Sequence, residues 1–427
     1  MRIFKFIVAA SFSILMHQTL AAQVNPEVIY DPNIHSVRLN PYGDQESMAI
    51  YKLNSGDKME LHFDDMEARV KSYYYTYQLC DYNWQPVNLS PFDFIKGFTQ
   101  QRIGDYRFSS ISYTRYTHYQ AVLPDANSIP TRSGNYLIKV FLDGDTSKLA
   151  FTRALLVLDS KASVTAQVLQ PFTPDTYKTH QHVKFTVNLQ GLNTSNASQQ
   201  IKIVVLQNNR WNLAQGNVLP TFIRNNSLEY SNENTFVFPG GKEWRWLDLR
   251  SFSLLSDRVD SANKKRTDIY VKPDIDKSAQ RYIYYADLNG KYLVTTFENI
   301  NPYWQGDYAN IHFRFVTPDR LPLADKDIYL IGQMTGYRLN ESTKMHFNNE
   351  KGMYENSQYL KQGYYSYGYT MVDKNDPSKR VDVDGNYWET ENSYTILVYY
   401  KSFTDQADQL IGVSNINTRS NRAGFSF

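Results

Sequence analysis

Residues 72–80 read SYYYTYQLC, and this short stretch points to the fold class of the whole chain. Tyrosine and threonine favour β-strands, and the stretch contains no glycine or proline that would interrupt one. Similar runs recur from residue 60 onward, whereas the 3.6-residue periodicity of an amphipathic helix is almost absent. Many short strands without intervening helices predict an all-β protein made of sandwiches or barrels.

Glycine-containing turns separate these runs, as antiparallel strands require. Asp143-Gly144, Asn289-Gly290 and Asp384-Gly385 are typical of hairpin turns. The stretches SGNYLIKVF (133–141) and QGYYSYGYT (362–370) each place a glycine before a Tyr-led strand, where it can adopt the positive φ of a sandwich corner. Strands expected in other parts of the chain include residues 136–142, 281–285, 364–371 and 394–400.

Two polar breaks divide the chain, one around residues 159–163 and one around residues 299–302. They predict three consecutive β-sandwich domains of immunoglobulin-like or early-set type, each of a normal size for a sandwich. The expected boundaries are 23–160 for the N-terminal sandwich, 161–301 for the middle one and 302–427 for the C-terminal one, which has an early-set layout.

The first 22 residues, MRIFKFIVAASFSILMHQTLAA, have the pattern of a cleaved signal peptide. Arg2 and Lys5 supply the charged start, a short apolar run follows, and Ala21-Ala22 supplies the cleavage site. The alternative is an uncleaved N-terminal anchor. Cys80 is the only cysteine of the chain, so no internal disulfide can form and core burial must supply the stability.

The charge of the chain argues against nucleic acid and anionic lipid as partners. The formal net charge is +2, and removal of the signal peptide takes away two basic residues and no acidic one. A nearly neutral mature chain has no basic field to attract polyanions.

Several side-chain patterns resemble reactive or metal sites, and each has a simpler interpretation. Glu389 and Glu391 can share one strand face, as paired catalytic carboxylates would, but solvated rim charges are the favoured interpretation. Residues 382–386 do not match the spacing of an EF-hand calcium loop. His180 and His182 lack an identifiable third zinc ligand. We therefore predict no catalytic, cofactor or metal site and no enzymatic activity.

The segment YQLCDYNWQPVNLSPFDFIKGFTQQRIGDYRFSSISYTRYTHY (77–119) resembles the N-terminal domain of the type IX secretion system plug protein family of the Bacteroidetes. Three later blocks are similar to the same family: QNNRWNLA (207–214), FPGGKEWRWLDLRS (238–251) and DGNYWETENSYTILVYY (384–400). The middle block departs from the family pattern in reading KEWRW, where a phenylalanine nearer the arginine is expected.

This resemblance implies a non-enzymatic periplasmic protein without a cofactor. It implies several β-sandwich domains that bind the periplasmic opening of a giant outer-membrane β-barrel, the translocon of the system. The protein would seal that pore when no cargo is present, with no membrane span and no small-molecule substrate of its own. The alternative is a periplasmic carbohydrate-binding protein that uses exposed aromatic residues of the C-terminal domain, such as Trp388 or Tyr337.

The loop after Cys80 supplies the expected contact residues for the partner. Four aromatic residues there are spaced too irregularly for one strand: Trp84, Phe92, Phe94 and Phe98. Aromatic side chains of this kind are enriched at protein interfaces. The alternative is that they form a small satellite core under a long loop.

Overall fold

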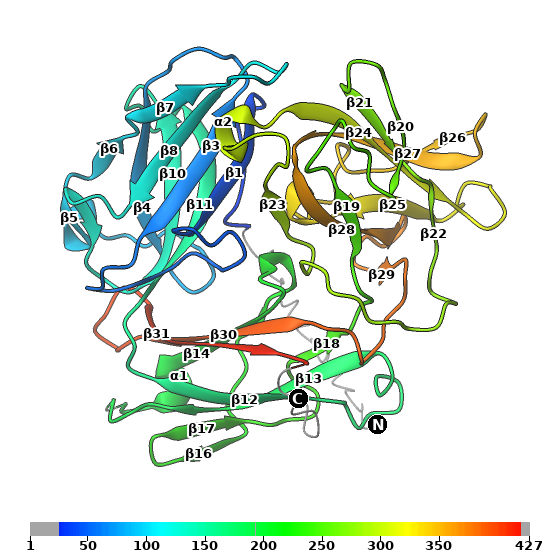
Figure 1. Ribbon diagram of the computed structural model, residues 1–427. Coiled ribbons are helices and arrows are strands. Elements are labelled where there is room, and N and C mark those ends of the chain that lie inside the picture. Colours follow the sequence, from blue (N-terminus) through cyan, green and yellow to red (C-terminus); the bar gives the residue numbers. More distant parts are fainter. Residues whose placement is uncertain (1–24, 193, 420–427) are drawn as a thin grey trace, which may run out of the picture.

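The computed structural model describes residues 25–192 and 194–419. The expected signal peptide at residues 1–22 therefore lies outside the described residues. Strands form nearly all of the secondary structure (Figure 1), which confirms the all-β fold class. Within the described ranges the only α-helices are two four-residue turns, α1 (Ala197–Gln200) and α2 (Pro302–Gln305).

The first sandwich packs a four-stranded sheet against one half of a long mixed sheet. Alternating residues of SYYYTYQLC supply its core, because Tyr73, Tyr75 and Tyr77 point between the sheets. The four-stranded sheet contains β1 (Ile34–Pro41), β3 (Met59–Asp65), β8 (Thr117–Leu123) and β7 (Asp105–Phe108). The facing half contains β2 (Ile50–Lys52), β11 (Leu149–Leu158), β10 (Gly134–Leu142), β4 (Tyr73–Cys80) and β6 (Gln100–Arg102). A small accessory pair, β5 (Ile95–Gly97) and β9 (Ser128–Pro130), lies beside it, after the 3-10 turn η1 (Pro91–Asp93).

The second sandwich uses the other half of the same long sheet. This half contains β31 (Gln409–Asn417), β30 (Ser393–Tyr400), β14 (Ile201–Gln207) and β15 (Gln215–Gly216). The opposing sheet contains β12 (Ser163–Leu169), β13 (His180–Asn188), β17 (Ser227–Tyr230), β16 (Phe222–Arg224) and β18 (Val237–Pro239). The 3-10 turn η2 (Trp211–Leu213) follows β14. The two halves join where Leu158 of β11 pairs in parallel with Leu410 of β31.

The third sandwich lies beside both of the others (Figure 1). One side contains β19 (Arg245–Asp248), β23 (Tyr292–Val294), β28 (Gly363–Asp373), β25 (Lys326–Ile331) and β29 (Arg380–Asp382). The other contains β20 (Val259–Ala262), β21 (Asp268–Val271), β22 (Asp274–Ile275), β24 (Tyr308–Val316), β26 (His346–Asn348) and β27 (Met353–Lys361). The 3-10 turn η3 (Gln333–Thr335) follows β25.

The structure divides the chain differently from the expected boundaries. The boundary at residues 301 and 302 lies inside the third sandwich, whose core extends from Leu247 to Val383. Strands β30 and β31 return to the second sandwich, where β30 pairs with β14 along its whole length. The physical reason is that β30 is buried on both faces, so it needs a central place in a sheet and a partner strand on each side.

The expected strand at residues 281–285 is absent, since this segment is extended but forms no ladder. Its tyrosine hydroxyls hold it instead: Tyr282 donates to a carboxylate oxygen of Glu243, and Tyr285 donates to the Glu243 carbonyl at 3.0 Å. Of the two glycines expected at sandwich corners, Gly134 adopts a positive φ, whereas Gly363 does not. Gly134 has φ +144°, and a Cβ there would lie 2.8 Å from the carbonyl oxygen of Asp408.

Aromatic packing joins the first and second sandwiches on the outer face of the long sheet. Trp84 follows β4 and Trp211 lies in η2, and their rings meet edge-on at 4.8 Å. Both belong to one buried cluster with Leu156 of β11 and Tyr399 of β30. A cluster that draws on both halves of the sheet prevents the two sandwiches from hinging freely.

A buried ion-pair network joins the first and third sandwiches. The Lys361 ammonium of β27 contacts the Asp64 carboxylate of β3, and both side chains are 1% exposed. His118 Nδ1 donates to Asp64 Oδ1 at 2.7 Å, and the Tyr308 hydroxyl donates to Oδ2. Burial lowers the pKa of His118 to about 4, so the imidazole is neutral at pH 7. Both carboxylate oxygens of Asp64 accept hydrogen bonds.

Candidate functional site

The structure separates the four expected contact residues into two pairs. Trp84 and Phe94 are each 1% exposed and lie in core clusters. They therefore belong to the core, as the alternative interpretation predicted, and cannot contact a partner in this arrangement. Phe92 and Phe98 are 78% and 65% exposed. The division follows from what packs against each ring, because none of the four lies within a strand: Trp84 packs into the cluster with Trp211, and Phe94 packs into the core of the first sandwich.

The two exposed phenylalanines begin a longer apolar surface, which we call the outer edge segment and define as residues 92–113. It runs along β5, β6 and β7 on the outer rim of the first sandwich (Figure 1). All four residues of β7 are exposed. The exposed large apolar side chains of the segment are Phe92, Phe98, Tyr106, Phe108, Ile111 and Tyr113. Such a concentration on one rim is typical of an interaction surface.

Hydrogen bonds to the third sandwich hold the end of this segment in place. The Ser110 amide donates to the Trp304 carbonyl at 2.9 Å, and the Tyr113 amide donates to Asp307 Oδ2 at 2.9 Å. The Arg107 guanidinium lies 5.3 Å from the centre of the Trp304 ring. The backbone is therefore fixed while the side chains of Ile111 and Tyr113 face solvent, so little ordering entropy would be lost on binding a partner.

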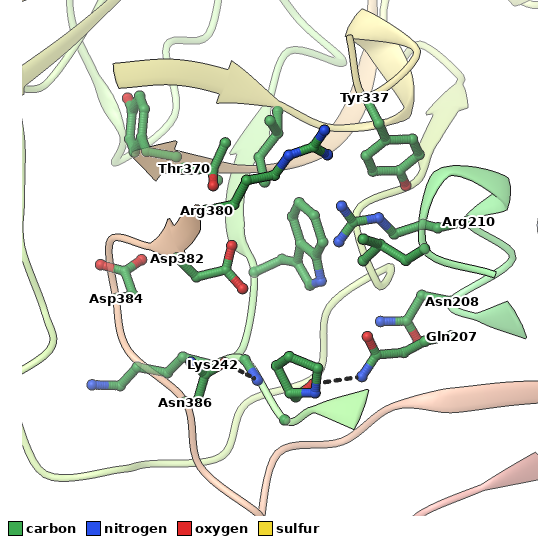
Figure 2. A pocket seen from close by; sticks show the side chains of 18 of the residues that line it. Gln207, Asn208, Arg210, Lys242, Tyr337, Thr370, Arg380, Asp382, Asp384 and Asn386 are labelled. Carbon is green, nitrogen blue, oxygen red and sulfur yellow. Dashed lines mark hydrogen bonds between the residues drawn. The ribbon is translucent and has the colours of Figure 1, made fainter. Parts of the chain in front are cut away.

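A cavity of about 370 Å³ opens between the second and third sandwiches. Figure 2 shows its walls, with Arg210 and Tyr337 on one side and Asp382 and Arg380 on the other. The Arg210 guanidinium lies 4.7 Å from the Tyr337 ring centre and 5.6 Å from that of Trp244. Apolar and charged groups therefore face the same space, as in sites for small molecules.

Three of the blocks singled out in the sequence meet around this cavity. QNNRWNLA contributes Arg210, FPGGKEWRWLDLRS contributes Trp244, and DGNYWETENSYTILVYY contributes Asn392. Other side chains of these blocks stabilise the fold. Trp211 turns away into the aromatic cluster, and Arg245 forms buried ion pairs with Asp274 and Asp384. The sequence contained the blocks but no signal that they would converge.

Residues 34–159 match the family model described as the type 9 secretion system plug protein 1st domain. The chain carries a type 9 secretion plug domain. The matched range coincides with the first sandwich, from the start of β1 to the end of β11. It includes the outer edge segment, Trp84 and Asp64, so this plug domain provides both the exposed rim and the contacts to the other two sandwiches.

The whole three-sandwich arrangement is similar to the solved structure of a hypothetical protein from Parabacteroides merdae. The two chains share 28% sequence identity with a TM-score of 0.86, and the similarity covers 92% of this chain and 98% of that one. A comparison with curated proteins found no match. The similarity therefore extends over all three sandwiches.

The plug domain indicates a role related to type 9 secretion. In residues 25–192 and 194–419, the structure has no helix with the length and apolar character needed to cross a membrane. The same ranges contain no group of three or more His, Cys, Asp and Glu side chains suited to a metal ion.

Glu391, one of the two paired carboxylates considered in the sequence, takes part in hydrogen bonds within the fold. Glu391 accepts a hydrogen bond from Asn289 Nδ2 at 3.0 Å and another from Asn417. The backbone carbonyl of Trp388 accepts from Gln181 Nε2 at 2.7 Å. Tyr337 covers the Arg210 guanidinium in the cavity, and Trp388 does not line that cavity. The two aromatic residues of the carbohydrate alternative thus do not form one stacking platform.

Two buried acids near Glu391 were missed in the sequence because they lie far apart along the chain. Burial raises the pKa of Glu243 and that of Asp287 to about 7. Glu243 accepts from the Glu391 amide at 3.1 Å, while its Oε2 atom is buried without a hydrogen-bond partner. Asp287 accepts from the amides of Trp244 and Asn289. The positions of these acids explain their pKa shifts without a catalytic role.

Replacing Glu243 with glutamine is expected to stabilise the protein more at pH 8 than at pH 5, by about 2 kcal/mol. Because the folded-state pKa is raised, wild-type Glu243 binds a proton in the folded but not the unfolded protein between about pH 4 and 7. That contribution to stability is lost as the pH rises through 7. Urea unfolding at the two pH values measures the difference. The exposed Glu350→Gln control should show none, and an equal effect at both pH values would contradict the assignment.

Proposed function

We propose that this protein binds the periplasmic opening of the outer-membrane translocon barrel of the type 9 system. In this role it closes the pore when no cargo protein occupies it. The observation that carries the proposal is the plug-domain match over residues 34–159. A pore wide enough for folded cargo would leak small molecules if left open, so a protein that blocks it needs shape and contact area rather than reactive groups.

The construction of the molecule supports this proposal. A protein that closes a pore must resist deformation. Three features restrain the sandwiches against one another: the shared sheet, the Trp84–Trp211 contact and the Asp64–Lys361 pair. The nearly neutral charge keeps docking insensitive to salt. Both features suit a protein that must dock and leave repeatedly.

The outer edge segment is the surface that we propose for this contact, and Phe92 and Phe98 are the two expected contact residues that remain available. Aromatic side chains bury large areas yet tolerate water when the partner is absent. The segment is held by backbone hydrogen bonds, so it is ready to bind without prior folding.

Replacing Phe92, Phe98, Ile111 and Tyr113 together with serine is expected to reduce recovery of the translocon barrel at least about tenfold, since exposed aromatic anchors dominate interface energies. The measurement is affinity purification of the tagged protein from the outer-membrane fraction after crosslinking in cells. The matched control replaces two exposed leucines of the other sandwiches, Leu219 and Leu254, with serine. Their loss should leave recovery unchanged.

The sealing role is tested separately in cells that lack the protein and whose cargo supply is switched off. Such cells should admit a large antibiotic that the outer membrane normally excludes, and the serine variant should restore the barrier poorly. Wild-type protein recovered only as a soluble monomer, or deletion cells with an unchanged barrier, would contradict the proposal.

A further inference from the structure

The cavity between the second and third sandwiches contains a cationic group without a direct ion pair, on which Asp382 acts electrostatically from the opposite wall. Arg210 enters it from the turn before η2, and its guanidinium lies against the rings of Tyr337 and Trp244. Its Nε atom is buried without a hydrogen-bond partner. No carboxylate of the described residues lies within ion-pair distance of it. Arg210 is half-buried, and leaving a partly desolvated guanidinium without a counter-ion is costly unless a ligand compensates for it.

An anionic group on the opposite wall interacts with Arg210 only electrostatically across the cavity. Asp382 ends β29, and among residues 25–192 and 194–419 its carboxylate has neither a hydrogen bond nor an ion pair. Burial raises the pKa of Asp382. Its neighbour Asp384 differs, since it accepts from Arg245 and from the Lys277 amide at 3.1 Å. Figure 2 shows Asp382 and Arg210 on either side of the cavity.

Several other polar side chains of the cavity have partners of their own. Gln207 Nε2 donates to the Pro239 carbonyl at 2.8 Å, and Asn208 Nδ2 donates to Asn392 Oδ1 at 2.7 Å. Lys242 points away and donates to the carbonyls of Lys277 and Gln280. The exposed side chain of Arg380 adds a second positive charge to the lining. The apolar lining includes Leu213, Trp244, Ile331 and Leu339.

We propose that this cavity binds a free α-amino acid with an apolar side chain. Its carboxylate would bind the Arg210 guanidinium, its ammonium group would bind Asp382, and its side chain would lie along Trp244, Ile331 and Leu339. An arginine fork suits a carboxylate bidentately. A volume of about 370 Å³ is at the scale of small-molecule sites. A neutral sugar would leave both charges only partly compensated, so a zwitterion fits the two groups better.

Isothermal titration calorimetry of the purified full-length protein with L-leucine and L-phenylalanine tests this inference. We expect binding of either amino acid, and at least tenfold weaker binding of leucine methyl ester and of N-acetyl-leucine, because each derivative lacks one charge. Arg210→Gln and Asp382→Asn should each weaken leucine binding at least tenfold. The exposed residues Arg102 and Asp175 provide matched controls, and Arg102→Gln and Asp175→Asn should bind as the wild type does.

The melting temperatures of the same variants show whether a loss of leucine binding results from misfolding. Because Arg210 and Asp382 form no hydrogen bond or ion pair in the empty cavity and attract each other only across it, Arg210→Gln and Asp382→Asn should change the melting temperature little. A marked fall in melting temperature would show that the two charges stabilise the fold, which overturns the inference. Absence of binding, retention of binding by both variants, or tighter binding of glucose through the same residues would also overturn it.

Discussion

Replacing Lys361 with methionine is expected to lower the free energy of unfolding by about 3–5 kcal/mol. The change keeps most of the side-chain volume but leaves the Asp64 carboxylate buried without its counter-charge. Burial by itself would raise the pKa of Asp64, yet the Lys361 ammonium and the His118 hydrogen bond hold it below its usual value. The carboxylate of the wild-type protein therefore stays charged at pH 7, and in the variant it either remains buried without its counter-charge or binds a proton, both of which cost stability. Urea unfolding followed by tyrosine fluorescence measures the loss.

Two further variants distinguish this cost from a general packing defect. Adding Asp64→Asn to Lys361→Met should recover part of the lost stability, because the buried charge is then removed as well. The control Lys344→Met breaks an ion pair with Asp327 whose side chains are 29% and 23% exposed. It should cost at most about 1 kcal/mol, as surface pairs do. Equal losses for Lys361→Met and Lys344→Met would show that the Asp64 network does not join the sandwiches.

Replacing Trp84 with alanine is the second large effect, with an expected loss of about 3–5 kcal/mol. The indole fills the space between the plug domain and the second sandwich, where it meets Trp211 at an interplanar angle of 86°. Loss of the ring leaves a cavity that the two sheet halves cannot close, because β11 and β31 are already hydrogen-bonded. Chemical unfolding measures the stability, and small-angle scattering should show a larger radius of gyration for the variant.

The exposed aromatic residue Phe98 provides the control for this prediction. Phe98→Ala removes a ring that is 65% exposed, so its effect should stay within about 0.5 kcal/mol. A double-mutant cycle between Trp84→Ala and Trp211→Ala should give a coupling energy of about 1 kcal/mol for the edge-on pair. A Trp84→Ala variant as stable as Phe98→Ala would contradict the structural role of this cluster.

The sequence by itself determined the all-β class, because alternation and turn residues are local properties. Residues 72–80 alternate between the core of the first sandwich and the opposite face of the sheet, as a period of two requires. The glycine before residues 135–142 occupies a backbone conformation that other residues rarely adopt. The resemblance of residues 77–119 to the plug family also lay within one continuous domain, so a family match could confirm it.

Only the tertiary structure decided which strands pair across domains and which side chains are buried. Strand β30 pairs with β14 because its two apolar faces need cover from separate parts of the chain, and its own sequence cannot specify those partners. Trp84 and Phe98 are both aromatic residues of one loop, yet distant packing buries only the first. Arg210 and Asp382 likewise meet across a cavity formed by two sandwiches. Burial and electrostatic pairing are sums over neighbours in space, so residues far apart in sequence determine them.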